Sequence, residues 1–491
     1  MKPSIIAVII SASSLSGLAG CTVGPDFHAP KPNLPAHWNQ HDAPENQSKT
    51  VSNNIDSKWW TSFGDPQLSA LLKDAQANNL SLKEAANHVE QSLAVRSTVT
   101  ADRLPSLGAT GGYSYARNSS QGLTDISGHD GKSDYSVWDS GLNASWELDL
   151  WGRVRRSVEV ANANVQISEE DQHAALVSIL SETARDYIQL RGTQNSLKIT
   201  QQNLDIAQHS LDLTKARMSQ GVATNLEVSQ EAALVESIEA RIPPLQQQES
   251  VLINALSFLI GREPGALNAE LGTIKDIPAG PANVPVGIPS ELAQRRPDIR
   301  RAEATLHAAT AGIGIAKANF YPGITLSGDV GFQSMQLSNM GGWASHSFAF
   351  GPGINLPLFE GGRLTGALKL SENRQKDAAI AYQRTVLAAW HEVDNDLSGY
   401  QAEQRRHQSL VNAVKDSQNA LASAEDQYKQ GSVDFVNVLT VQNALLENQA
   451  ALIQSTAEVS LTLVNLYQAL GGGWEQGTGV TAPLTAAAIK K

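Results

Sequence analysis

Two very long stretches without proline constrain this 491-residue chain more than any other feature. Residues 153–220 and 363–430 each count 68 positions and contain none of the chain's 20 prolines. As α-helices that rise 1.5 Å per residue, each stretch would be about 100 Å long. A compact domain has no need of an element that long, whereas a stalk or a tube does.

The two stretches belong to an internal duplication. One set of positions recurs in the second half at an offset of 210 residues, and a second set nearer the start recurs at an offset of 217. Because a period near 210 is too long for a stacking repeat, the chain contains two copies of one structural half. The first set pairs Arg153, Leu211, Gln220, Gly221, Leu256 and Gly261 with Arg363, Leu421, Gln430, Gly431, Leu466 and Gly471.

Each copy carries a predicted β-hairpin, over about residues 106–149 and about residues 324–358. In the first hairpin, apolar residues such as Trp138, Leu142 and Trp146 share one parity and mostly polar residues share the other. This alternation predicts strands with one apolar and one polar face. Such strands are typical of outer-membrane barrels, and also of a soluble antiparallel sheet with one wet face.

Four strands are too few to close a barrel, for which about eight is the practical minimum. An open sheet in lipid would leave edge groups unsatisfied, at several kcal/mol each. We therefore expect a membrane barrel built from these strands to be shared between chains. Three chains would supply about 12 strands around a water-filled bore, whereas two would supply about 8, a barrel that side chains fill. The strand count favours a trimer if the protein is a channel.

The predicted long helices carry apolar residues at seven-residue spacing, which is the coiled-coil period. Examples are Leu197, Leu204 and Leu211 in the first copy. Return helices are expected over 222–261 and 433–471. Shorter helices are expected near 67–103 and 290–320, where they can stack on the return helices. These elements predict a ring of helices.

The N-terminus has the pattern of a secretory signal, with Lys2, a short apolar run and small residues before a cleavage site. We expect a signal peptide over 1–20, which is too short to span a membrane as a mature helix. Cys21 is the single cysteine, so an intramolecular disulfide is impossible. The net charge of −12 argues against a nucleic-acid partner.

These observations divide the chain. We expect a signal peptide (1–20), a proline-rich N-terminal linker (21–66), a first repeat (67–262), an inter-repeat linker (263–289), a second repeat (290–474) and a tail (475–491).

Four segments carry a specific family resemblance. They are residues 21–27 (CTVGPDF), 288–303 (IPSELAQRRPDIRRAE), 318–322 (ANFYP) and 467–474 (YQALGGGW). In this order they closely resemble motifs of outer-membrane efflux lipoproteins of the resistance-nodulation-division type, the TolC-like or NodT family. The resemblance implies a mixed α and β fold, in which a trimer forms a 12-stranded transmembrane β-barrel, with four strands per chain. A long periplasmic α-helical barrel continues it.

The resemblance also implies a function. The chain would be a passive outer-membrane exit duct that docks with a periplasmic adaptor and a proton-driven inner-membrane pump, as in antibiotic resistance. Cys21 after Leu-Ala-Gly resembles a lipobox, which implies cleavage before Cys21 and acylation of that residue by a fatty acid such as palmitate. The lipid-anchored protein would lie in the outer membrane and extend into the periplasm.

The family resemblance places the closed gate at the periplasmic helical tips. Glu425 and Tyr428 match the family's acid and tyrosine there. Asp426 and Asp434 on the same tip, and Asp212 near the other tip, complete the set of gate candidates. Where some relatives carry a basic and an acidic residue, this chain has Ala422 and Val433, which leaves a salt-bridged gate in question. We hypothesise a partly acidic, cation-attracting constriction that the adaptor dilates. The expected adaptor-docking residues are Gln220, Gly221, Gln430 and Gly431.

Residues for bond chemistry are not evident, so the sequence predicts no enzyme, no metal site and no cofactor beyond the lipid on Cys21. Two other functions remain open: an exit duct for type I protein secretion, and a periplasmic coiled-coil lipoprotein without a pore. The cargo is not encoded in a readable motif, because drugs, solvents, aromatic acids and metal ions leave through similar ducts.

Overall fold

The computed structural model describes residues 22–30, 38, 48–51, 56–117 and 134–474. The chain divides into two compact units. Unit 1 comprises residues 1–30, 89–167 and 302–382, and unit 2 comprises the remainder of the chain. The predicted signal peptide, Cys21 and the tail 475–491 lie outside the described residues.

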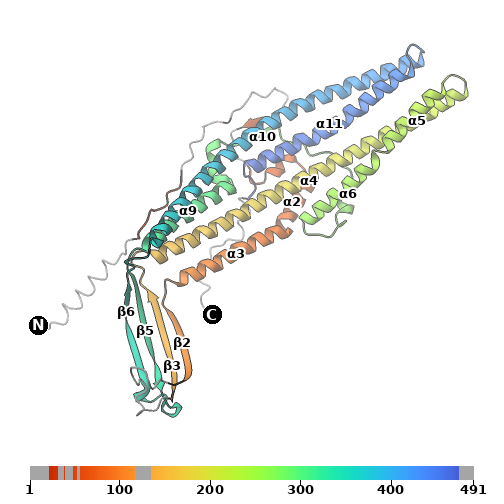
Figure 1. Ribbon diagram of the computed structural model, residues 1–491. Helices are drawn as coiled ribbons and strands as arrows, with labels where there is room; N and C mark the ends of the chain where they lie inside the picture. The colour runs from red at the N-terminus through yellow and green to blue at the C-terminus, as the bar shows by residue number, and fades with distance from the viewer. Residues whose placement is uncertain (1–21, 31–37, 39–47, 52–55, 118–133, 475–491) are drawn as a thin grey trace. The chain divides into compact units, whose positions relative to one another are not determined.

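Unit 1 contains a four-stranded antiparallel sheet in the order β2-β3-β5-β6 (Figure 1). Its middle pairing joins the two copies of the repeat. Trp146 lies opposite Leu326 and Asn143 opposite Asp329, so the two copies place apolar residues on one face and polar residues on the other. The predicted hairpins correspond to these strands: β2 (Ser106–Arg117), β3 (Asp134–Glu147), β5 (Gly323–Ser334) and β6 (His346–Asn355). Two short 3-10 turns, Leu337–Asn339 and Trp343–Ser345, lie between β5 and β6.

A single chain leaves this sheet incomplete. Within the residues that the structure describes, β2 and β6 each pair along one edge. Large apolar side chains of β6 are also uncovered: Phe348 is 67% and Phe350 83% exposed. Unpaired strand edges invite pairing with another chain.

The long helices begin where these strands end. Asp149 accepts hydrogen bonds from the backbone N–H groups of Val154 and Arg155, at 3.0 and 2.9 Å, and so caps α4 (Arg153–Ser219). Gly152 precedes the helix with φ of 82°, a conformation that favours glycine. Helix α10 (Arg363–Lys429) also has 67 residues, so each long helix is one residue shorter than predicted.

The segment that follows Cys21 packs on unit 1. The Val23 N–H donates to the Trp151 carbonyl over 3.1 Å, and Arg156 bonds Asp26 at 2.7 Å. A Cβ on Gly24 would lie 2.5 Å from the Cα of Gly314, in α9 (Pro297–Ala318), so glycine at both positions permits this close approach.

In unit 2 the first return helix is interrupted, so the prediction of one helix over 222–261 is wrong. Helix α5 (Asn225–Glu239) ends and α6 (Ile242–Leu259) begins just before Pro243 and Pro244. Proline lacks an N–H and its ring clashes with the preceding turn, so it fits the first turn of a helix rather than the middle. The second return helix, α11 (Phe435–Ala469), is continuous.

The predicted helix near 67–103 is also two helices, α2 (Pro66–Asn78) and α3 (Leu80–Ala101). Asn79 is 3% exposed and stands at the break. Its side chain donates to the Leu259 carbonyl over 2.8 Å and accepts from the Leu82 N–H over 3.1 Å. These bonds stabilise a sharp junction that hydrophobic periodicity does not predict.

The predicted helix over 290–320 is divided as well, into a 3-10 turn (Pro289–Glu291), α8 (Leu292–Arg295) and α9. Pro297 disfavours helical geometry in the residue before it, which ends α8. The neighbouring arginines form ion pairs with acids of α4 and α10. Arg296 pairs with Glu392 at 2.7 Å and Arg300 with Glu170 at 2.6 Å.

The two predicted linkers contain ordered structure. Strand β1 (Lys49–Val51) pairs in parallel with β4 (Asn283–Pro285), and two short helices, η1 (Trp59–Phe63) and α7 (Asn268–Leu271), flank the first repeat. The buried Arg191 of α4 donates to the Gln67 side chain at 2.7 Å and to the Thr273 carbonyl at 2.8 Å. This guanidinium thereby joins the inter-repeat linker to the start of α2.

Among the described residues, none of the helices is both long and apolar enough to cross a bilayer. The same residues include no group of three or more His, Cys, Asp or Glu side chains arranged to hold a metal ion.

Candidate functional site

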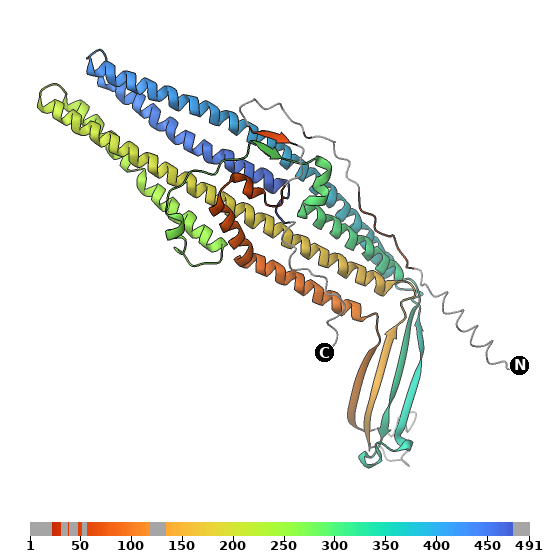
Figure 2. The same cartoon turned by 180° about the vertical axis from the view of Figure 1, so that it is seen from behind.

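The candidate site is the end of unit 2 where α4 turns into α5 and α10 turns into α11 (Figure 2). Both turns have the same geometry. Gly221 and Gly431 have φ of 76° and 71°, and the N–H groups that follow them, from Val222 and Ser432, each bond back to the last helical turn at 3.0 Å. This is the usual glycine C-cap of a helix. The predicted docking residues Gln220, Gly221, Gln430 and Gly431 are all exposed at these turns.

A capping box starts the return helix of the first tip. The Thr224 hydroxyl accepts from the Glu227 N–H over 3.3 Å, and the Glu227 carboxylate accepts from the Thr224 N–H. This backbone bond is the main reason that the pKa of Glu227 is lowered, with Tyr428 and the positive charge of Arg217 contributing further. Glu227 is therefore held as a carboxylate at the tip.

Tyr428 joins the two tips. Its hydroxyl donates to Glu227 over 3.1 Å, and the Arg217 guanidinium lies 4.7 Å from its ring centroid. Its ring also lies 5.3 Å from that of Phe435 at the start of α11. Partial burial, reinforced by the bond to Glu227, raises the pKa of Tyr428. The neutral hydroxyl can therefore act as a donor at physiological pH.

The other four gate candidates are not gathered by a single chain. All four are exposed. Asp212 lies 3.8 Å from Lys215, and Asp426 lies 3.4 Å from Lys429, each within its own helix. Asp434 occupies the position before α11, where its side chain makes no capping bond. Glu425 lies one turn before the tip. A joint role for these acids therefore depends on other subunits.

A hydrophobic cluster supports the first tip, and a buried acid lies beside it. Glu231 is 0% exposed and accepts from the Ser210 hydroxyl at 2.6 Å. Burial raises the pKa of this carboxyl group. The cluster comprises Leu204, Ala207, Leu211, Leu234, Val235, Ile238 and Leu446, from α4, α5 and α11.

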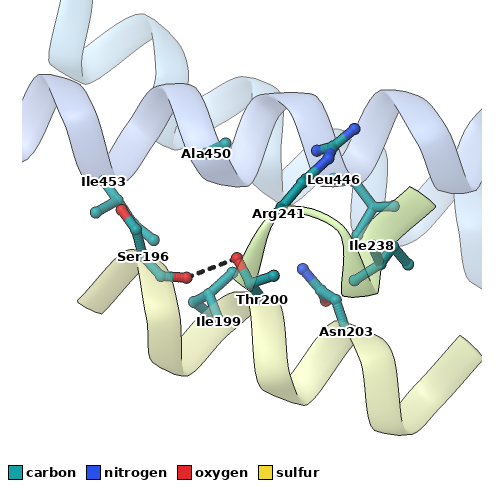
Figure 3. A pocket seen from close by; sticks show the side chains of 9 residues that line it. All are labelled: Ser196, Ile199, Thr200, Asn203, Ile238, Arg241, Leu446, Ala450 and Ile453. Atoms are coloured by element: carbon teal, nitrogen blue, oxygen red, sulfur yellow. Dashed lines mark hydrogen bonds between the residues drawn. The ribbon is translucent and has the colours of Figure 1, made fainter. Parts of the chain in front are cut away.

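A small cavity of about 40 Å³ lies near this cluster, at the interruption between α5 and α6 (Figure 3). Helix α4 contributes Thr200, whose hydroxyl donates to the Ser196 carbonyl over 2.7 Å, and Arg241 comes from the interruption itself. A cavity of this size suits one or two water molecules rather than a cargo molecule.

The duplication also places one acid at the same position of each long helix. Asp186 and Asp396 are 210 residues apart and both half-buried. Burial raises the pKa of each to about 6, and the negative charges of Glu182 and Glu392, respectively, raise it further. Both helices therefore carry acids that titrate near neutral pH.

Comparison with known families decides the identity of this architecture. The model of the outer membrane efflux protein family matches residues 71–262 and 288–472. The chain belongs to the outer membrane efflux protein family. The two matched ranges nearly coincide with the two repeats read from the sequence.

Full-length relatives agree with this assignment. The antibiotic efflux pump outer membrane protein ArpC of Pseudomonas putida is 32% identical, over 98% of this chain and 97% of its own. The cation efflux system protein CusC of Escherichia coli is 29% identical, over 94% and 97%. The solved outer-membrane channel OprN has a TM-score of 0.85 at 32% identity, covering 92% of this chain and 100% of its own.

The chain is therefore a TolC-like outer-membrane efflux channel with a mixed α and β fold, as the family resemblance implied. Its family consists of channel proteins rather than enzymes. The relatives carry names that refer to different cargoes at similar identity, antibiotics for ArpC and cations for CusC. Similarity therefore establishes the duct and leaves its cargo undecided.

Three tip residues were missed by sequence reasoning: Arg217, Glu227 and Phe435. The Thr-x-x-Glu pattern at 224–227 is a capping-box signature and could have singled out Glu227. The contacts of Arg217 and Phe435 with Tyr428 depend on which helices face one another, which periodicity alone does not specify.

Proposed function

We propose that three copies of this chain form one continuous duct through the outer membrane. The observation that carries the proposal is the four-stranded sheet, which in the described part of the chain has two unpaired edges and uncovered apolar side chains. Closure between chains satisfies the edge groups that lipid cannot. Three sheets supply 12 strands, enough for an aqueous bore lined by the polar residues that alternate along each strand.

The helical tips then serve as the periplasmic gate and as the docking end. Tyr428 supports the first role, because its contacts with Arg217 and Glu227 tie the two tips of a subunit together. A periplasmic adaptor would separate them on docking, and an inner-membrane pump of the resistance-nodulation-division type would drive the cargo. The pump supplies the energy, while the duct remains passive.

Acylated Cys21 would anchor each subunit in the membrane. Residues 22–27 support this role, since they lie against the start of α4 through Val23 and Asp26. An anchor at Cys21 would then be held beside the base of the barrel rather than on a free tether.

Neither alternative accounts for the observations as well. A coiled-coil lipoprotein without a pore has no use for the four-stranded sheet. A type I secretion duct would share the fold, but the named relatives are components of efflux systems.

Photo-crosslinking at the tips tests the docking proposal. A crosslinker at Gln220 or Gln430 should capture a periplasmic adaptor in cells, while the same group at the exposed Gln246 on α6 should not. Docking at the tips is refuted if neither tip position gives an adduct under transport conditions.

A further inference from the structure

A pocket of about 560 Å³ lies in unit 1 where the strands meet the long helices. This volume lies in the range of small-molecule sites. Apart from Ile354, which has the apolar parity, its strand residues share the parity of the sheet's polar face: Glu147, Gly323, Thr325, Gly353 and Asn355. In the proposed trimer that face lines the bore, so this inference rests on the proposed function.

One side of the pocket is aromatic. The rings of Trp151 and Tyr321 stack at 4.7 Å with an interplanar angle of 26°. The Trp151 indole N–H donates to the Pro322 carbonyl over 3.0 Å, which fixes the ring. Tyr321 is still 42% exposed. A fixed and accessible aromatic surface favours flat organic groups.

Another side is charged. Arg153 and Arg363 are duplicated positions at the starts of α4 and α10, and they form ion pairs with Glu147 and Glu360, respectively. Arg153 engages its carboxylate through two nitrogens. Arg363 uses Nε, and its side chain is 66% exposed. In the described chain, its two terminal amino groups remain available for a second acceptor.

The acids of the pocket are already occupied. Glu147 and Glu360 are paired with the two arginines. Asp149 accepts two backbone N–H groups and bonds the Arg155 guanidinium at 3.1 Å. The charged group with bonding capacity to spare is therefore the Arg363 guanidinium, whose planar donors suit a carboxylate or sulfonate.

We propose that this pocket is a transit site for amphiphilic organic anions. The flat part of the ligand stacks on Trp151 and Tyr321, and its anionic group bonds to Arg363. Such a site would hold cargo briefly at the step from the helical section into the barrel. Weak binding is required, because a duct must release what it receives.

The test is binding of 2-naphthoate to the full-length protein in phosphatidylcholine nanodiscs, measured by isothermal titration calorimetry. We expect saturable binding, weakened about tenfold or more in Arg363→Gln through loss of a charge-assisted bond. Tyr321→Ser should also weaken it. Arg406→Gln, which removes another Arg–Glu pair three residues apart on α10, should bind normally. Uncharged 2-naphthamide should bind the unsubstituted protein and Arg363→Gln equally.

Absence of saturable binding would overturn the proposal, as would equal 2-naphthoate binding by Arg363→Gln. Displacement of the probe by phosphatidylglycerol in the nanodisc would also overturn it, by assigning the pocket to a lipid headgroup. If Arg363→Gln fails to fold, Arg363→Lys should keep the charge and still weaken binding. Conductance of the same preparation separates the two proposals. If the probe does not bind but the channel conducts, only the transit site is refuted. If the channel does not conduct, the proposed duct is refuted.

Discussion

At the scale of single residues, the tip depends on one aromatic side chain. Tyr428 meets a carboxylate, a guanidinium and a phenyl ring from three different helices. The exposed acids nearby have no such network. In the proposed duct, the Tyr428 contacts would hold the two tips of one subunit together, while the acids would set the charge of the entrance.

Tyr428→Phe should loosen the tip without removing its ring contacts. The lost bond to Glu227 is worth about 1 kcal/mol, so the open-to-closed ratio should rise about fivefold per subunit. Single-channel recording of open probability measures this. Ser423→Ala, which removes an exposed hydroxyl bonded to Asn419 within α10, should leave open probability unchanged. A normal open probability in Tyr428→Phe would contradict the role of Tyr428.

The double variant Glu425→Gln and Asp434→Asn should reduce cation selectivity. Both carboxylates are exposed at the tip, and threefold symmetry would bring six negative charges near the axis, where they attract cations. The reversal potential under a salt gradient should shift toward zero. The acidic-constriction hypothesis fails if the reversal potential matches that of the unsubstituted channel.

At the scale of elements, the long helices were predictable and the short breaks were not. A proline-free stretch of 68 residues has few alternatives to a helix, and strand alternation located both hairpins. Pro243 and Pro244 are a sequence signal for the break between α5 and α6, because proline favours the first turn of a helix. The break at Asn79 and the three-residue strands β1 and β4 depend on partners far away in the sequence, so a local sequence pattern does not predict them.

The matched acids of α4 and α10 give these helices a pH dependence. A folded-state pKa of about 6 for Asp186 and Asp396, above the ordinary value of 3.8, means that ionisation opposes folding. This destabilisation is absent below about pH 3.8. It grows between about pH 3.8 and pH 6 and is complete above about pH 6. Asp186→Asn with Asp396→Asn should therefore stabilise the fold at pH 8, by about 1 kcal/mol per site.

Thermal unfolding in detergent from pH 4 to pH 8 checks this expectation. The gain in melting temperature should appear between pH 4 and pH 6 and stay constant above. The exposed Asp416→Asn on α10 is the matched control and should produce no such curve. A gain that is independent of pH would rule out ionisation as its cause.

At the scale of the whole molecule, the proposed duct requires more than one chain. Among the described residues, the edge strands β2 and β6 each leave one edge unpaired, and the alternating faces of the sheet suit a barrel in which one face lines water and the other meets lipid. In the sequence, alternation predicts the strands of this sheet, and the strand count favours closure of a barrel between chains. The cargo could not be predicted, because a passive duct has no need of a binding motif that names its cargo.

The most direct test places a single cysteine on β5 and records single-channel current during exposure to a positively charged methanethiosulfonate. Ser327 has the polar parity and lies opposite Ser145 and Gly351, so Ser327→Cys has room, while Leu326→Cys has the apolar parity. The unsubstituted protein, whose single cysteine is Cys21, serves as the control for any reaction of the reagent at Cys21. We predict three successive, similar drops in conductance for Ser327→Cys and none for Leu326→Cys. A current unaffected at Ser327→Cys, or reduced equally at both positions, would contradict a bore shared by three chains.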